Sequence, residues 1–472
     1  MKERKKLSLF LACLPILVVI FMGLMSVMKW KAGMHTPLIG SIITAALIGK
    51  YLGISWDEME KGLVEGVARA LPALFIMLIV GTIIGSWIAG GIIPTLIYYG
   101  LKLISPKVLV PASAFVTAIV SLSTGTSFTS LATVGLALMA TGVSMGFPAP
   151  LVAGAVISGA YFGDKLSPLS DTTNLAPAMA GCTLFEHVGH MLWDTIPAFL
   201  CSLILYYFIG LKYATSSLAQ PEQIQAIFTG LENSFIISPW LLLIPIITIV
   251  LAVKKVPAIP ALACVSVLGA ICAMLFQGVG FGGILNAITF GFTSNTEIKM
   301  VDSLLSRGGI VAMGGTIILL TLATALGGIL EKIGSLEVLL TSIMKRVKSN
   351  GQLMLATLFS GLAIAFATGA QLLAVIVPAR MFVPAFKERN LHTKNLSRAA
   401  EAVGTVGINL VPWSVPALFA QNILGVEPSQ FIPYIFFAYF VIIANAIYGY
   451  TGISIAKISK EDKELADTNI KA

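Results

Sequence analysis

Apolar stretches recur along the whole chain, each close to the length of about 18 or more residues that crosses a bilayer as a helix. Residues 55–69 differ, because charged side chains alternate there with apolar ones such as Trp56 and Met59, which favours an amphipathic helix lying at the membrane surface. The pattern predicts an all-α polytopic membrane protein. Candidate spans lie at about 8–28, 36–53, 70–90, 92–104, 148–163, 195–211, 235–253, 257–276 and 309–330.

One apolar run is interrupted by a polar stretch at 159–177, which contains two carboxylates, a lysine, two prolines and several hydroxyl and amide side chains. Pro168 lacks a backbone donor and clashes with the preceding turn, so the helix entering this stretch should break near 165–170. A carboxylate at the centre of a membrane costs roughly 2.5–3.5 kcal/mol on insertion scales. The carboxylates here must therefore face protein, water or an ion.

The predicted break has the chemistry of an ion site. Freed carbonyls, hydroxyls and carboxylates are oxygen ligands of the kind that Na⁺ needs, and transporters place broken helices near the bilayer midplane. Asp171 is our first candidate for a group that binds either Na⁺ or H⁺, because Thr172, Thr173 and Asn174 surround it, and Asp164 is the second. The alternative is a charged loop at the membrane surface that meets only water.

The same carboxylate can serve two ions in turn. Burial favours its protonated form and a bound cation favours its ionised form, so H⁺ and Na⁺ compete for it. Such competition is the basis of an antiport mechanism. Lys165 complicates the site, since it can pair with Asp164 or extend to the membrane surface.

A second polar interruption, 121–130, lies between apolar helices and contains Gly125, which favours a helical hairpin dipping partway into the bilayer. Its candidate ion-binding residues are Ser123, Thr124, Gly125 and Thr126. Sliding the sequence by 244 residues places Thr124-Gly125 on Thr368-Gly369, and the motif Gly-x-x-Leu-x-Pro-x-Ser at 163–170 on the same motif at 407–414. We therefore predict an internal repeat in which each copy has a hairpin tip and a broken helix.

The second copy has no carboxylate opposite Asp164 or Asp171. Glu401 lies in its Ala-rich helix and shares a helical face with Thr405 and Asn409, because the three recur every four residues. Glu401 is therefore a candidate proton carrier or second ion site. The other candidate site residues of this copy are Thr368, Gly369, Gln371, Asn409 and Ser414.

A cluster of Glu186, His187, His190 and Asp194 precedes the span predicted at 195–211. Glu186 and His190 would share a helical face, as would His190 and Asp194, so a metal site can be drawn there. A charged turn at the membrane surface is the favoured interpretation. Arg398 is likewise expected at a helix end or in a loop.

Composition agrees with a membrane protein: 57% of the residues are hydrophobic and only 11% are charged, against about 25% in soluble domains. The net charge of +8 sits in loops, and the basic start favours a cytoplasmic N-terminus of a multi-pass protein in a prokaryotic cytoplasmic membrane. Basic residues scattered singly between spans argue against nucleic acid as a partner. The expected organisation is 1–211 as the first repeat with leading helices, 212–232 as a polar connection, 233–455 as the second repeat and 456–472 as a charged tail.

The stretch Gly-Ala-Tyr-Phe-Gly-Asp-Lys-Leu-Ser-Pro-Leu-Ser-Asp-Thr-Thr-Asn-Leu-Ala at 159–176, with Ser-Thr-Gly-Thr-Ser at 123–127, resembles the NhaC-type sodium/proton antiporter family. The resemblance implies two inverted repeats, a scaffold part and a moving transport part, elevator-like motion and commonly a homodimer. It also implies hairpin tips at Ser123–Ser127 and Thr368–Gln371, and breaks at Asp164–Asn174 and Asn409–Ser414.

The leading function is therefore a Na⁺/H⁺ antiporter without a cofactor, with Na⁺ at Asp171, Asp164 and Thr124. The alternative is a Na⁺-coupled organic-anion exchanger, such as one of protonated malate for Na⁺ and lactate, in which Lys165 would hold the anion. An intramembrane hydrolase using Asp164 and Asp171 is disfavoured, because Pro168 interrupts the helix that would align them. A channel is also disfavoured, because a continuous pore would need to be lined by charged side chains from many spans, and few of the predicted spans have them.

Overall fold

Helices make up the regular structure of the computed structural model, which describes residues 6–30, 32–216, 221–254, 256–296, 302 and 305–458. Within those ranges the one β pairing is an isolated bridge between Leu391 and Lys457. Seven described helices are long and apolar enough to span a membrane, or up to ten if each of three bent pairs is one span. The prediction of an all-α polytopic membrane protein is confirmed. The basic start at 2–5, Lys255 and most of the predicted tail (459–472) lie outside the described residues.

The helices of the first half are, in chain order, α1 (Leu9–Leu24), α2 (His35–Leu52), α3 (Trp56–Ala89), α4 (Ile92–Leu103), α5 (Leu109–Thr124), α6 (Ser127–Ser130), α7 (Leu136–Ser144), α8 (Ala149–Leu166), α9 (Asp171–Ala180), α10 (Leu184–Ser216) and α11 (Pro221–Ser234). Those that follow are α12 (Leu243–Val253), α13 (Ala258–Leu275), α14 (Phe281–Phe290), α16 (Gly314–Lys332), α17 (Ser335–Met344), α18 (Asn350–Thr368), α19 (Gln371–Met381), α20 (Val383–Glu388), α21 (Lys394–Glu401), α22 (Val415–Leu424), α23 (Pro428–Phe431) and α24 (Phe436–Thr451). A π turn, η3 (Leu131–Gly135), joins α6 to α7, and a π turn η6 (Ala402–Val406) and a 3-10 turn η7 (Gly407–Leu410) continue α21.

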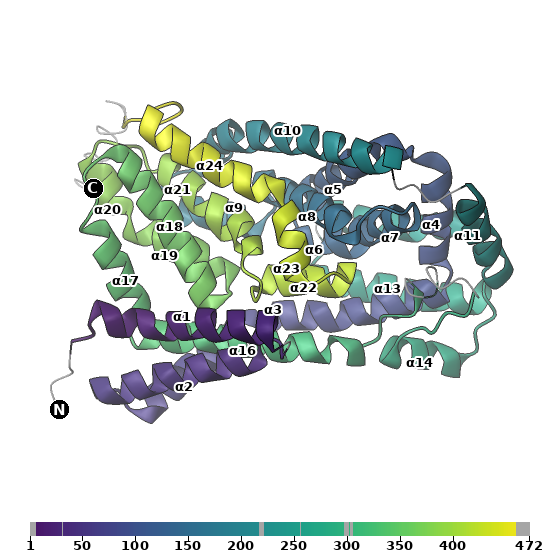
Figure 1. Cartoon of the computed structure of the whole chain (residues 1–472), viewed down its shortest axis with the longest axis horizontal. Helices are drawn as coiled ribbons and strands as arrows, with labels where there is room; N and C mark the ends of the chain where they lie inside the picture. The colour runs from purple at the N-terminus through teal and green to yellow at the C-terminus, as the bar shows by residue number, and fades with distance from the viewer. Residues whose placement is uncertain are drawn as a thin grey trace.

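Helix α3 runs along one side of the molecule and packs against α16, α13 and α14 (Figure 1). Its contact with α16 is close because Gly66 faces the Thr324 carbonyl and Gly62 faces Gly328, so no side chain separates the two backbones. The sequence predicted a separate surface helix at 55–69, and this prediction is wrong. A capping box of Ser55 and Glu58 starts α3 there, and the helix continues without interruption to Ala89.

A second group of helices surrounds the two predicted breaks. Helix α8 packs on α5, α10 packs on α5, α21 and α24, and α19 and α21 pack on α9. Gly159 and Gly163 on α8 lie directly against the backbone of α5, which is why these two helices approach so closely. Hairpin α5–α7 is therefore held against α8, the first part of the broken helix α8–α9.

The ends of the elements repeat with the spacing predicted from the motifs. Helix α5 ends at Thr124 and α18 at Thr368, and each is followed by a glycine with positive φ, +70° at Gly125 and +61° at Gly369. After the breaks, α9 begins at Asp171 and α22 at Val415, again 244 residues apart. Whether the two copies are inverted stays a prediction.

One boundary prediction is wrong. The charged cluster before residue 195 does not form a turn, because α10 is one helix from Leu184 and Thr183 with Glu186 caps its start. The predicted polar connection at 212–232 contains the end of α10 and most of helix α11. In both places, polar residues form helix starts and surfaces that pack on other helices.

Gly66→Ala should destabilise the protein, because the new Cβ would overlap the Thr324 carbonyl oxygen of α16. Overpacking of this kind costs about 1–3 kcal/mol. Thermal unfolding of the detergent-solubilised protein measures the effect as a lower midpoint. The control is Gly189→Ala on α10, an exposed glycine whose Cβ would meet nothing within 4 Å. Equal midpoints for the two variants would contradict the close α3–α16 contact.

Candidate functional site

The first break lies beside the first hairpin tip. Helix α8 ends at Leu166, α9 starts at Asp171, and the residues between them are not helical, as the sequence predicted. A Cβ added at Gly125 would lie 2.6 Å from the Cβ of Leu169, so only glycine lets the tip approach the break this closely. The Ser167 hydroxyl donates to the Leu122 carbonyl of the hairpin at 2.9 Å.

Asp164 lies at the centre of this contact and is only 6% exposed. Its Oδ2 accepts a hydrogen bond of 2.6 Å from the Ser127 hydroxyl, which comes from the hairpin. Its Oδ1 accepts one of 2.5 Å from the Ser170 hydroxyl, which comes from the break. The Thr172 hydroxyl lies 3.1 Å from that of Ser170. The carboxylate is therefore enclosed by hydroxyl oxygens from two elements.

Two predicted ligands instead hold the break in shape. Thr173 donates to the carbonyls of Asp164 and Lys165 at 3.1 and 3.0 Å. Asn174 donates to the carbonyls of Pro168 and Ser170 at 2.7 and 2.8 Å. Both side chains satisfy carbonyls that the broken helix leaves without intrahelical donors.

The other predicted residues of the first copy are less central. Asp171 is exposed at the first position of α9, so the structure places the second-ranked carboxylate, Asp164, in the buried position instead. Thr124 is buried in the tip, with its hydroxyl 3.2 Å from that of Ser130. Ser123 donates back to Ile119, and Thr126 is half-buried.

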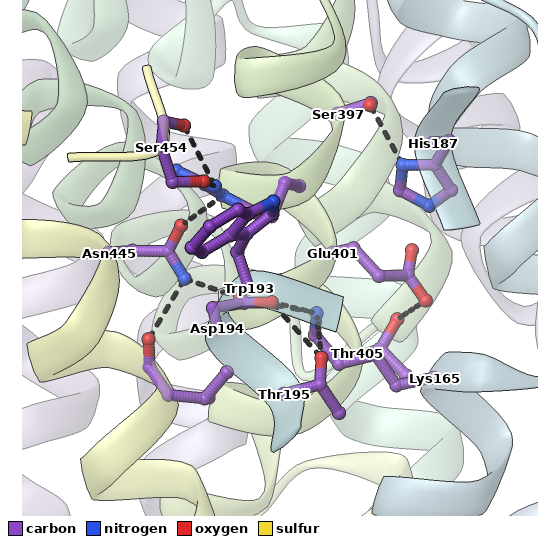
Figure 2. A network of polar contacts seen from close by, with 12 residues as sticks. Lys165, His187, Trp193, Asp194, Thr195, Ser397, Glu401, Thr405, Asn445 and Ser454 are labelled. Carbon is purple, nitrogen blue, oxygen red and sulfur yellow. Dashed lines mark hydrogen bonds and ion pairs between the residues drawn. The ribbon is translucent and has the colours of Figure 1, made fainter. Parts of the chain in front are cut away.

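Lys165 is fully buried and pairs with Asp194 of α10, at 3.1 and 3.2 Å to its two carboxylate oxygens (Figure 2). Its ammonium also donates to the Thr195 hydroxyl at 2.9 Å. Neither prediction for Lys165 is correct, because it is held neither by Asp164 nor at the membrane surface. The sequence did not show that α10 brings Asp194 to the end of α8, so Asp194 was not predicted as the partner of Lys165.

The same network continues to α21 and α24. Asn445 donates to Asp194 at 2.6 Å (Figure 2). Asn445 also accepts from Arg398 at 3.0 Å, and Arg398 donates to the hydroxyl and carbonyl of Ser454. Arg398 lies in the last turn of α21, as predicted for a helix end, and it is fully buried. The sequence contains one signal for this network, because Asn445 is a single asparagine inside the apolar run of α24.

The second break begins earlier than its proline. After Glu401 the chain leaves α geometry for the π turn η6 and then the 3-10 turn η7, and π turns often mark functional positions. Glu401 is fully buried, and its Oε1 accepts from Thr405 at 2.9 Å. Among the described residues, no side chain donates to its Oε2 in normal geometry, and Asn409 Oδ1 is likewise unpaired.

The second tip packs on the second break much as the first does. The Val415 amide donates to the Gly369 carbonyl at 2.9 Å, and the Ser414 hydroxyl donates to Ile408. Thr368 is buried, but its hydroxyl donates within its own helix. Gln371 is half-buried at the start of α19. The second copy thus keeps the tip contact and lacks the hydroxyl cage around a carboxylate.

The histidines of α10 connect to α21. His187 lies 2.8 Å from the Ser397 hydroxyl, and His190 lies 3.0 Å from Asn395. No group of three or more His, Cys, Asp or Glu side chains that could hold a metal occurs in the described ranges. The histidines therefore join two helices.

This architecture is that of a multi-pass membrane protein of the secondary-transporter type, with a buried carboxylate between a hairpin tip and a broken helix. A profile of the Na⁺/H⁺ antiporter family matches residues 159–453. The chain belongs to this family. It is 36% identical over 458 residues to the Na⁺/H⁺ antiporter NhaC of Alkalihalophilus pseudofirmus, covering 97% of this chain and 98% of the relative.

Other relatives carry different names at nearly the same identity. The malate-2H⁺/Na⁺-lactate antiporter of Bacillus subtilis is 35% identical over 456 residues, covering 96% of both chains. The arginine/ornithine antiporter ArcD of Halobacterium salinarum is 35% identical over 468 residues, covering 98% of this chain and 96% of the relative. All three are named as antiporters, and overall identity does not separate their cargoes.

Asp194→Asn should destabilise the protein strongly, because Lys165 would remain buried without its charge partner. Removing one member of a buried ion pair costs about 3–5 kcal/mol. The double variant Lys165→Met/Asp194→Leu should be less harmful than Asp194→Asn alone, since it removes both charges of the Lys165–Asp194 pair together. Thermal unfolding in detergent checks the order of the midpoints.

The matched control for this prediction is Glu65→Gln, which removes one member of the exposed pair Lys61–Glu65 and should change the midpoint little. A double variant as unstable as the sum of its single variants would contradict the coupling of Lys165 and Asp194.

Proposed function

We propose that this protein exchanges Na⁺ for H⁺ across the cell membrane, with Asp164 as the carboxylate that binds either ion. The supporting observation is the hydroxyl cage of Ser127 and Ser170 around this buried group. A hydroxyl oxygen that donates to a carboxylate still has lone pairs, so it can act as a cation ligand at the same time. When Asp164 is protonated, the same hydroxyls can accept its proton.

Competition at one group couples the two ions. Na⁺ at Asp164 excludes the proton, and the proton neutralises the charge that attracts Na⁺. A carrier that changes its orientation only when one of them is bound then moves the two ions in opposite directions. This step needs no covalent chemistry and no cofactor.

The proposed movement is alternating access of an elevator-like kind. Its support is the match between the two halves, in which tips, breaks and helix ends recur 244 residues apart. Two nearly equivalent halves can exchange conformations, which would open the site to each side of the membrane in turn. The homodimer stays a prediction from the family resemblance.

The alternative cargo is a small organic anion, which the name of the Bacillus subtilis relative suggests. An anionic carboxylate needs a cationic partner, and Lys165 was the predicted one. Its ammonium already contacts both oxygens of Asp194 and the Thr195 hydroxyl. The geometry around Asp164 consists of oxygen atoms, so it favours a cation as the ligand.

Asp164→Asn should abolish exchange, because an amide can neither ionise nor attract Na⁺. The measurement uses everted membrane vesicles that lack other antiporters, with a respiration-driven pH gradient followed by a fluorescent dye. Addition of Na⁺, Li⁺ or K⁺ dissipates the gradient when the cation exchanges for H⁺. We expect a response to Na⁺ with the wild type and only the background of empty vesicles with the variant.

Asp171→Asn separates the two candidate carboxylates in the same assay. Because Asp171 is exposed, we expect this variant to retain exchange, and the exposed Glu337→Gln on α17 serves as a control for loss of a surface carboxylate. Loss of exchange in Asp171→Asn with retention in Asp164→Asn would move the site to Asp171. A wild type that responds only when malate and lactate are supplied would instead support the organic-anion exchanger.

A further inference from the structure

Asp164 and Glu401 are the buried carboxylates beside the two breaks. The proposed exchange at Asp164 gives Glu401 no role. It comes from the second half of the chain, and Asp164 comes from the first. One carboxylate oxygen of Glu401 accepts a single hydrogen bond from Thr405, and the other accepts none in normal geometry from the described residues (Figure 2). An ionised carboxylate held in this way is costly to bury, so the site favours a bound proton.

The charged neighbours of Glu401 do not neutralise it directly. Lys165 on α8 is a cation that acts electrostatically on Glu401, and its hydrogen bonds go to Asp194 and Thr195 of α10. Arg398, one turn earlier on α21, donates to Asn445 and Ser454. Asp164 is the other charged group acting on Glu401, and it has the same sign.

Two hydroxyls lie between the carboxylates. The Thr172 hydroxyl of the first break acts on the Glu401 carboxylate without a hydrogen bond of normal geometry, and it lies 3.1 Å from the Ser170 hydroxyl. The Ser170 hydroxyl in turn donates to Asp164 at 2.5 Å. Thr172 and Ser170 are both fixed by the first break, at the start of α9. Thr172, Ser170 and Asp164 are therefore linked in that order, and a closer approach of Thr172 to Glu401 would complete a chain of exchangeable protons inside the protein.

We propose that Glu401 is a second proton-binding group that delivers protons to Asp164, and removes them, through the hydroxyls of Thr172 and Ser170. A proton passes from Glu401 to the Thr172 oxygen as the Thr172 proton passes to Ser170 and the Ser170 proton passes to Asp164. Each hydroxyl gains one proton and loses one, so the net change is one proton moved between carboxylates. This inference rests on the proposed Na⁺/H⁺ exchange at Asp164.

The test compares two rates in proteoliposomes containing the full chain: pH-driven ²²Na⁺ uptake, which needs proton transfer, and ²²Na⁺/Na⁺ counterflow, which does not. Thr172→Val keeps the shape of the side chain and removes the hydroxyl. We expect the ratio of pH-driven uptake to counterflow to fall at least about a hundredfold, the lower end of the range for lost proton-transfer catalysis. Thr172→Ser restores a hydroxyl and should restore the ratio.

Glu401→Gln is the second variant, and it should lower the same ratio while Glu401→Asp recovers part of it. An unchanged ratio in Thr172→Val or Glu401→Gln would overturn the relay, as would an equal fall in both rates, since that would make Thr172 a structural residue or a Na⁺ ligand. Asp164→Asn should lose both rates. A wild type without pH-driven uptake would refute the proposed function itself, which is a different result from failure of the relay alone.

Discussion

A helix that breaks inside a membrane must find hydrogen-bond partners within the protein, because hydrocarbon supplies none. Each break in this chain meets a hairpin tip. The first break bonds to the hairpin through Ser167 and Leu122, and the second tip bonds to the second break through Gly369 and Val415. Thr173 and Asn174 satisfy further carbonyls of the first break. These contacts make the non-helical backbone of the two breaks tolerable inside a membrane protein.

Burial also explains which charged side chains bind polar partners on other helices and which face hydroxyl groups. Lys165 binds Asp194 of α10, and Arg398 binds Asn445 of α24 and Ser454. Asn445 also donates to Asp194, so the two cations belong to one network. This leaves Asp164 and Glu401 facing hydroxyls. In the proposed exchange, a lysine in contact with Asp164 would occupy the position of the transported cation. Under that proposal the network beside the site would have a positioning role as well as a stabilising one.

The sequence predicted the local features of the two helix breaks and their hairpin tips. Pro168 and its neighbours predicted a break that the structure places between Leu166 and Asp171, and the spacing of Thr-Gly tips to Pro-containing motifs predicted the matching positions 244 residues later. These features are local, because proline, glycine and apolar run length act on the backbone within a few residues. The candidate carboxylates Asp164 and Glu401 were also visible, since a buried charge stands out in an apolar run.

What the sequence could not decide was which side chains face one another across helices. The choice between Asp171 and Asp164 and the partners of Lys165 and Arg398 all depend on how α8, α10, α21 and α24 are packed. One apolar helix face looks like another in sequence, so the partner of a buried polar residue is set by tertiary contacts. The chain alone thus determined the helices, their breaks and the chemistry available at them. The tertiary structure decided which carboxylate is enclosed by hydroxyls and which is paired with a cation.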